Sequence, residues 1–161
     1  MHTLGFIGSG LVGGTLARLA TTAGLDVVLG NSRGPEFLAG LVAELGDHAR
    51  AATAEDVARE AELVVVSVPL TAFPHLPTAA LAGRTVIDTT NYYPERDGRL
   101  PELDFDELTS SELLQRILPR STVVKAFNNL FHHHLATLAR PSASLDRSAL
   151  PIAGEDEPAK G

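Results

Sequence analysis

A glycine motif near the start of the chain, Gly-x-Gly-x-x-Gly at residues 8–13, constrains the fold more than any other feature of the sequence. An apolar run that begins at Leu4 leads directly into it, and a helical pattern over residues 11–22 follows. Glycines at this spacing between a strand and a helix are typical of a dinucleotide-binding turn. The alternative is that the glycines serve only the turn.

Each glycine of the motif has an expected role. Gly8 permits the tight turn, Gly10 lets the backbone approach a pyrophosphate, and Gly13 lets the helix pack closely on the strand. The free N–H groups and the positive dipole end of the helix then face the phosphates. The residues predicted to bind the cofactor at this turn are Gly8, Ser9, Gly10, Leu11, Val12 and Gly13.

The end of the second predicted strand, residues 25–30, indicates which dinucleotide binds. NAD-binding chains place an acid at this point, where it binds the ribose 2′-hydroxyl. Here Asn31, Ser32 and Arg33 occupy the position. Amide, hydroxyl and guanidinium groups bind a 2′-phosphate, whereas a carboxylate would repel it, so we predict NADP(H). Alternatively, Arg33 is a solvated loop residue, and Asn31 and Gly34 serve the turn geometry.

The composition is that of an ordinary globular enzyme domain. The 161 residues suffice for one domain, and 44% of them are apolar, without a run long enough to span a membrane. The absence of Cys excludes disulfides and thiol chemistry. The net charge of −7, without a basic patch, argues against nucleic-acid binding. We expect a cytoplasmic protein without a signal peptide or a membrane partner.

Strand and helix patterns alternate along the rest of the chain, which favours a doubly wound α/β Rossmann-type fold with a mainly parallel sheet, as a single domain over residues 1–161. Further strands are predicted at residues 49–52, 63–68, 85–90 and 122–127. Helices are predicted at residues 35–45, 55–60 and 113–118, with another that contains Leu76 and Leu81. Residues 91–108 form a long polar loop in this prediction, and residues 150–154 begin a seventh strand.

In open α/β sheets, ligands bind beyond the carboxyl ends of the strands. Val68 and Pro69 follow the fourth strand, and we predict that they form an apolar wall against the nicotinamide and its ribose. Asn91 follows the fifth strand and Asn128 the sixth, where they are predicted to bind ribose hydroxyls or a second substrate. Each Asn has the alternative role of a turn residue.

Six segments spread along the chain carry a family resemblance. They are Ile-Gly-Ser-Gly at 7–10, Gly-Asn-Ser-Arg-Gly-Pro at 30–35, Val-Ser-Val-Pro-Leu at 66–70, Ile-Asp-Thr-Thr-Asn-Tyr-Tyr-Pro at 87–94, Thr-Ser-Ser-Glu at 109–112 and Val-Lys-Ala-Phe-Asn at 124–128. These segments resemble the NADP oxidoreductases that depend on coenzyme F420 (also written F-420), an 8-hydroxy-5-deazaflavin. The resemblance extends from about residue 3 to residue 156.

The resemblance implies a Rossmann fold, NADP bound through Ser32 and Arg33, and hydride exchange between NADPH and a deazaflavin co-substrate. The family continues beyond the segment that matches residues 151–155, with a helix, a strand and parts of the second-substrate pocket. We therefore expect this chain to be a fragment or a shortened member. An unpaired edge strand would then favour association with another chain, and we expect a homodimer.

Hydride transfer between two cofactors requires orientation but no catalytic triad or metal, so we predict no catalytic and no metal-binding residue. Consecutive histidines on a helix point about 100° apart, which argues against one shared metal ion at residues 132–134. One of them can still face the acceptor. Lys125 remains a weaker candidate for a catalytic amine.

Two alternatives stay open. One is an NADP-dependent reductase of another small substrate, such as a ketone, an imine or a hydroxy acid. The families that catalyse those reactions carry a helical domain after the Rossmann fold, for which this chain has no room. The other alternative is a non-catalytic NADP-binding module, and turnover with a small-molecule redox acceptor would exclude it.

Overall fold

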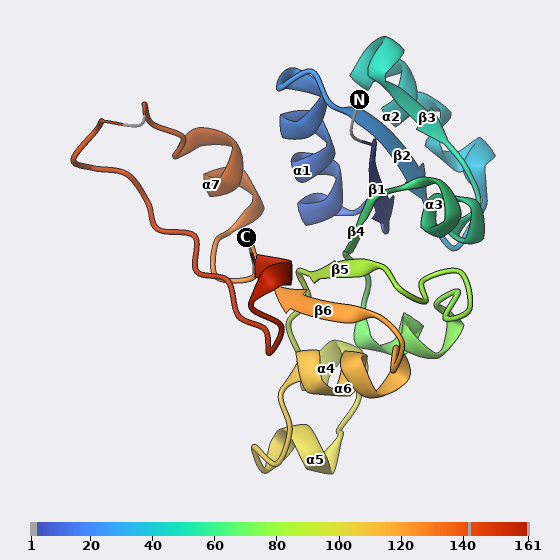
Figure 1. Ribbon diagram of the computed structural model, residues 1–161, viewed down its shortest axis with the longest axis vertical. Helices are drawn as coiled ribbons and strands as arrows, with labels where there is room; N and C mark the ends of the chain where they lie inside the picture. Colours follow the sequence, from blue (N-terminus) through green and yellow to red (C-terminus); the bar gives the residue numbers. More distant parts are fainter. Residues whose placement is uncertain (1–2, 142, 161) are drawn as a thin grey trace.

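In the computed structural model, which describes residues 3–141 and 143–160, the chain folds around one six-stranded sheet (Figure 1). All strand pairs are parallel, in the order β3-β2-β1-β4-β5-β6. The strands are β1 Thr3–Ile7, β2 Asp26–Gly30, β3 Ala49–Ala51, β4 Leu63–Val66, β5 Thr85–Asp88 and β6 Thr122–Lys125. This is the Rossmann strand order, so the predicted α/β fold is confirmed.

β1 is the strand from which the sheet extends in both directions. Phe6 of β1 lies opposite Leu29 of β2 on one side and opposite Val65 of β4 on the other. The chain builds outward to β3 and then crosses back over β1 to add β4, β5 and β6. The strand order therefore reverses between β1 and β4, and ligands of such sheets bind at the carboxyl ends of the strands beside this reversal.

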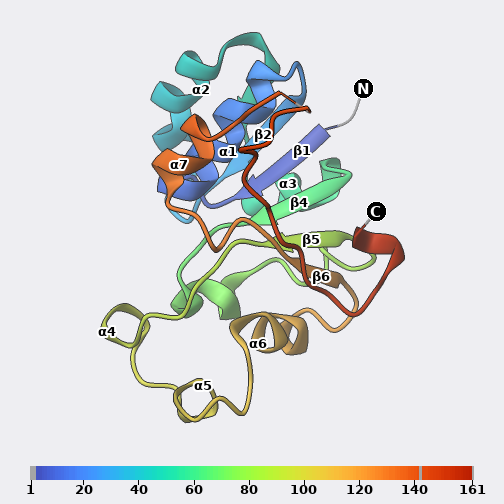
Figure 2. The same ribbon diagram turned by 90° about the vertical axis from the view of Figure 1, so that its left-hand side faces the viewer.

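Helices cover both faces of the sheet (Figures 1 and 2). The α-helices are α1 Leu11–Thr22, α2 Ala39–Leu45, α3 Ala54–Glu60, α4 Pro94–Asp97, α5 Pro101–Asp104, α6 Ser110–Ile117 and α7 His132–Thr137. The 3-10 helices are η1 Pro35–Leu38, η2 Gly46–His48, η3 Leu70–His75 and η4 Pro158–Lys160. Within the described ranges, no helix combines the length and apolarity that a membrane crossing needs.

The two faces hold separate apolar cores because successive strand residues point to opposite sides. Val65 of β4 packs on the face covered by α1, α2 and α7, together with Ala17 of α1 and Leu135 of α7. Val64 and Val66 pack on the other face, which α3, η3 and α6 cover. A continuous β-branched run is what a strand buried on both faces requires.

Two predictions for the middle of the chain are wrong. The helix expected around Leu76 and Leu81 is absent: η3 ends at His75 and turns follow, although both leucines are buried. Pro74 and Pro77 explain this, since neither can donate a backbone hydrogen bond. The predicted polar loop at 91–108 contains α4 and α5, each of which begins with a proline at its first position.

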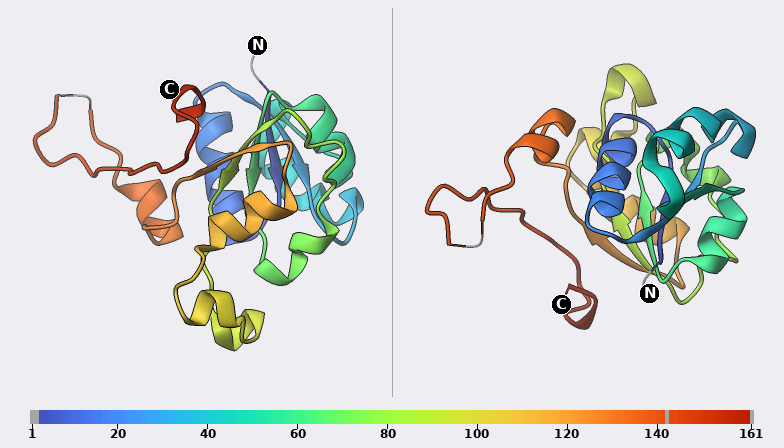
Figure 3. Two further views of the ribbon diagram at one scale, coloured as in Figure 1. Left: turned by 60° about the horizontal axis from the view of Figure 1, so that its bottom comes forward. Right: turned by 90° about the horizontal axis from the view of Figure 1, so that it is seen from above.

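Two further elements are shorter than expected. The helix predicted over residues 35–45 is divided into η1 and α2, with Leu38 buried and Phe37 57% exposed. The seventh strand predicted at 150–154 is reduced to one antiparallel bridge, in which Lys125 and Ala153 exchange backbone hydrogen bonds of 2.7 and 3.0 Å. The segment leading to it runs outside the body of the fold (Figure 3).

A capping box starts α6, in the Thr-Ser-Ser-Glu segment at residues 109–112. The Thr109 hydroxyl accepts the Glu112 N–H at 3.2 Å, and the Glu112 carboxylate accepts the Thr109 N–H at 2.7 Å. Both donors at the helix start are thereby satisfied. The box fixes the first turn of α6 against the ends of β5 and β6.

We expect Thr109→Ala to lower the free energy of unfolding by about 1 kcal/mol, the usual loss on removal of an N-cap hydroxyl. Urea unfolding followed by circular dichroism measures the change. Thr71→Ala is the control, at an exposed threonine whose hydroxyl makes no hydrogen bond to the residues described. Its effect should stay below about 0.5 kcal/mol. Equal losses in the two variants would contradict the capping role.

Candidate functional site: the cleft at the carboxyl edge of the sheet

The glycine turn after β1 is packed too tightly for side chains. Gly8 has a φ of 103°, and a Cβ there would lie 2.1 Å from the carbonyl oxygen of Ser67. A Cβ on Gly13 would lie 2.2 Å from the carbonyl oxygen of Gly8. Gly8 therefore makes the turn, and Gly13 lets α1 approach it, in the geometry expected from the sequence.

The space in front of α1 is open, and the start of this helix suits an anion. A Cβ on Gly10 would meet no described atom within 4 Å beyond its chain neighbours. Gly10 is the N-cap, no side chain of the described residues caps the helix, and the first turn carries no acid. Free N–H groups and the helix dipole thus face a pocket that a pyrophosphate fits.

At the end of β2, Asn31 holds the turn that follows. Its Oδ1 accepts the N–H groups of Arg33 at 3.0 Å and Gly34 at 2.9 Å, which is the turn role considered as the alternative. The Arg33 side chain is exposed, and its guanidinium lies 5.2 Å from the centroid of the Phe37 ring. The side chain of Glu36 packs against Gly34. Binding by Asn31, Ser32 and Arg33 stays a prediction.

A cleft of about 470 Å³ lies along the carboxyl ends of β1, β4, β5 and β6. It brings together seven residues predicted from sequence: Gly10, Leu11, Val12, Val68, Pro69, Asn91 and Asn128. Ten further residues line the cleft. Thr90, Tyr93, Phe127 and Asn129 lie in the segments after β5 and β6 that were expected there, and His132 is one of the three histidines considered. The sequence analysis missed Ser67, Thr89, Arg96, Leu130 and Phe131. The predicted residues 31–33 lie outside it, at the end of β2.

Asn91 and Asn128, which both line the cleft, are joined to each other by two hydrogen bonds. The Asn91 amide donates to the Asn128 carbonyl oxygen at 2.9 Å, and the Asn128 amide donates to Asn91 Oδ1 at 3.2 Å. The pair joins the ends of β5 and β6. Each side chain keeps unused hydrogen-bonding capacity for a ligand, and the contacts with a ligand stay a prediction.

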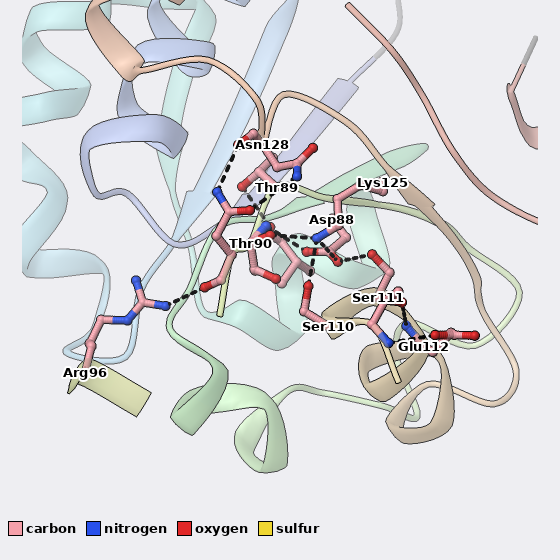
Figure 4. A network of polar contacts seen from close by, with 12 residues as sticks. Asp88, Thr89, Thr90, Arg96, Ser110, Ser111, Glu112, Lys125 and Asn128 are labelled. Carbon is pink, nitrogen blue, oxygen red and sulfur yellow. Dashed lines mark hydrogen bonds and ion pairs between the residues drawn. The ribbon is translucent and has the colours of Figure 1, made fainter. Parts of the chain in front are cut away.

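A buried ion pair joins the ends of β5 and β6, next to the cleft residues Thr89 and Thr90 (Figure 4). Asp88 at the end of β5 is 0% exposed and lies 2.8 Å from the Lys125 amine. It also accepts the Thr90 N–H at 2.8 Å and the Ser111 hydroxyl at 2.7 Å. The amine of Lys125 donates further to the Thr90 carbonyl at 2.6 Å and to Ser110 Oγ at 3.1 Å. The Lys125 amine thus has three partners among the described residues, which argues against its role as a free catalytic amine.

Arg96 on α4 lines the cleft and is fixed by its neighbours. It donates to both carboxylate oxygens of Asp97, from Nε at 2.9 Å and from Nη2 at 2.7 Å. The hydrogen bond to Asp97 raises the pKa of Arg96. Burial raises the pKa of Asp97, but the hydrogen bonds from Arg96 and from the Tyr93 N–H outweigh it and hold that pKa below its ordinary value.

The lowered pKa of Asp97 predicts a loss of stability in acid. Its contribution is complete above the ordinary value of 3.8 and disappears as the pH falls through the lower folded value. We therefore expect the gap in unfolding free energy between the wild type and Asp97→Asn to narrow below pH 3.8. Urea unfolding over a pH series measures this gap. Asp146→Asn, at an exposed carboxylate, controls for the loss of one charge, and an unchanged gap in acid would contradict the expectation.

The three consecutive histidines begin α7. His132 lines the cleft, in line with the expectation that one of the three faces it. The rings of His133 and His134 lie 4.1 Å apart, and Phe131 stacks on His133 at 5.7 Å. Over residues 3–141 and 143–160, no group of three potential His, Cys, Asp or Glu ligands is close enough to hold a metal ion.

Residues 3–92 match the family described as NADP oxidoreductase, coenzyme F420-dependent. The chain belongs to this family. The match covers more than half of the sequence and includes the glycine turn, the end of β2, and the Val68-Pro69 and Asn91 segments of the cleft. No protein of curated function matches the chain.

Two solved structures align with 99% of this chain and 76% of their own, each with a TM-score of 0.82. One is a hypothetical protein from Sinorhizobium meliloti, at 28% identity. The other, at 26% identity, is a candidate F420-dependent NADP reductase from Arthrobacter sp. FB24. A reductive aminase from Aspergillus terreus, solved with NADPH and ethyl-5-oxohexanoate, shares the fold at 19% identity and a TM-score of 0.59, over 83% of this chain and 43% of its own.

Family membership and fold together support NADP(H) as the cofactor and an oxidoreductase activity. The open space before Gly10 fits the pyrophosphate of this cofactor. When bound, NADPH supplies a hydride, and the protein's own residues have to position the ring that delivers it.

Proposed function

We propose that the protein transfers a hydride between NADPH and a deazaflavin, coenzyme F420, or a similar flavin-like acceptor. The observation that carries the proposal is the continuity of the cleft, which extends from the start of α1 past Val68 and Pro69 to the ends of β5 and β6. A dinucleotide bound at the start of α1 would occupy part of this length and leave the remainder for a second ring system.

The order of the groups along the cleft follows from the fold. The adenosine end of the dinucleotide would lie at the end of β2 and the pyrophosphate at α1. The nicotinamide would then reach the apolar wall of Val68 and Pro69, which follows β4. The part of the cleft formed after β5 and β6, with residues 89–91 and 127–132, is left for the hydride acceptor.

The side chains that line the cleft suit direct hydride transfer. They include Asn, Thr, Ser, Arg and His, but no carboxylate among the described residues. A hydride carries both electrons of the broken C–H bond, so the step itself needs no general base. Holding two rings in contact can supply about 7–11 kcal/mol of the barrier reduction through orientation alone.

The proposal is tested by titrating the protein with NADPH and NADH, followed by addition of oxidised coenzyme F420 and measurement of its absorbance. Preference for NADPH with bleaching of the deazaflavin would support the proposal. Tight NADPH binding without turnover would contradict it and favour another acceptor or a non-catalytic NADP-binding module. Weak binding of both dinucleotides would contradict the NADP assignment itself.

A further inference from the structure

Arg96 is a cation at the end of the cleft that the proposed function leaves to the hydride acceptor. It reaches the cleft from α4, where its Nη2 donates to the carbonyl oxygen of Asn91, the residue that follows β5 in the cleft. Figure 4 shows its guanidinium on the opposite side of the network from Lys125 and Ser111. No residue of α4 was predicted to take part in binding.

The guanidinium of Arg96 is held on three sides. Asp97, whose side chain is 0% exposed, accepts from Nε and Nη2. The carbonyl oxygen of Asn91 accepts from Nη2 at 2.8 Å, and the Tyr93 ring lies 4.9 Å from the guanidinium carbon. Within the described residues Nη1 has no hydrogen-bond acceptor, and the side chain is 44% exposed. Two N–H donors of a rigid group therefore remain for a ligand.

The charge of this group is already balanced by Asp97. A neutral pair is a poor trap for a free anion, because the carboxylate would repel it. Its N–H donors suit a carbonyl oxygen instead, and they bind it more strongly as negative charge develops on that oxygen. The pair therefore selects a ligand whose carbonyl becomes more negative during the reaction.

We propose that Arg96 Nη1 donates a hydrogen bond to a ring carbonyl of a planar, conjugated hydride acceptor, and that Asp97 positions it for this. The inference rests on the proposed function. The hydride leaves the dihydronicotinamide with its electron pair and forms a C–H bond on the acceptor ring. The nicotinamide becomes cationic, and an electron pair of the acceptor moves through its conjugated system onto the carbonyl oxygen. Solvent later supplies the proton.

Thr90 provides independent support for a polar ligand in this cleft. It is 5% exposed and lines the cleft, yet its hydroxyl has no hydrogen-bond partner among the described residues. Its N–H and carbonyl are both engaged, with Asp88 and with Lys125. A buried hydroxyl without a partner is unfavourable, and a polar acceptor molecule in the cleft would satisfy it.

The test compares Arg96→Ala and Arg96→Lys with Arg99→Ala. Arg99 is the matched control, because it lies three positions along, is 82% exposed and is absent from the lining of the cleft. We measure NADPH affinity, and kcat and KM with coenzyme F420 as the probe. Arg96→Ala should lower kcat/KM for the deazaflavin by about tenfold to a hundredfold, the effect of one charge-assisted hydrogen bond. The kcat/KM of Arg96→Lys should lie between that of Arg96→Ala and that of the wild type.

The affinity for NADPH shows whether each variant is still folded, and so separates a loss of deazaflavin binding from a loss of folding. It should change less than about twofold in every variant, because the dinucleotide does not use Arg96 in this arrangement. Asp97→Asn should raise the deazaflavin KM while NADPH binding stays intact, as expected of a positioning residue. Equal kcat/KM values for Arg96→Ala and Arg99→Ala would overturn the inference and leave the proposed function standing. A wild-type protein that neither binds nor reduces the deazaflavin would overturn both.

Discussion

Gly8→Ala is expected to lower the free energy of unfolding by about 3–5 kcal/mol, the sum of backbone strain and overpacking. The residue has a φ of 103°, and the new methyl group would lie 2.1 Å from the Ser67 carbonyl oxygen. That atom belongs to the backbone that leaves β4, so it cannot yield as a flexible side chain would. The turn before α1 would be displaced, and NADPH binding would be lost with it.

Gly24→Ala is the matched control, since Gly24 also has a positive φ, of 79°, but an added methyl group there would have nothing within 4 Å of it. Backbone strain alone should cost about 1 kcal/mol there. Urea unfolding and NADPH titration of both variants measure the difference between them in unfolding free energy and in NADPH affinity. Similar losses at the two positions would show that the close contact with Ser67 does not matter.

Arg33→Asp is expected to weaken NADPH binding by about 100- to 1,000-fold, through loss of charge-assisted hydrogen bonds and added repulsion of the 2′-phosphate. Because the side chain of Glu36 already packs against Gly34, the new Asp would add a second carboxylate to the turn that follows β2. NADH lacks the 2′-phosphate, so its affinity should change little. The preference between the two dinucleotides would thus be reduced or reversed.

Arg120→Asp carries the same change of charge at an exposed position just before β6, at the opposite edge of the sheet. It should leave both affinities within about twofold of the wild type, because exposed charges beyond a Debye length are screened. Isothermal titration calorimetry measures the affinity of each of the two variants for NADPH and for NADH. An unchanged NADPH affinity in Arg33→Asp would exclude Arg33 from the phosphate site.

The sequence predicts this fold well because the residue patterns that indicate each helix, strand and turn are local. The β-branched run of β4, the glycines at 8–13 and the Thr109 cap each act within a few residues of the chain, and each forms the structure that its pattern indicates. Parallel strands then bring their carboxyl ends to one edge, which places Val68 and Asn91 in the same cleft.

Arg96 and Asp97 could not be found in the same way. They are neighbours in a polar stretch that resembles a solvated loop, and only the packing of the fold buries the Asp97 side chain. One local signal existed: Pro94 opens α4 and Gly98, with a φ of 78°, closes it. Proline at the first position and glycine just beyond the last are the usual bounds of a helix.

Lys125 links two parts of the molecule that are far apart in sequence. Its amine contacts Asp88 at 2.8 Å next to the cleft, while its backbone N–H donates to the Ala153 carbonyl at 2.7 Å, in the segment 150–154 that bridges to β6. Exchange of this one amide hydrogen with solvent therefore requires residue 153 to separate from β6. A slow exchange rate that slows further on addition of NADPH would mean that occupancy of the cleft is transmitted to the outer edge of the sheet.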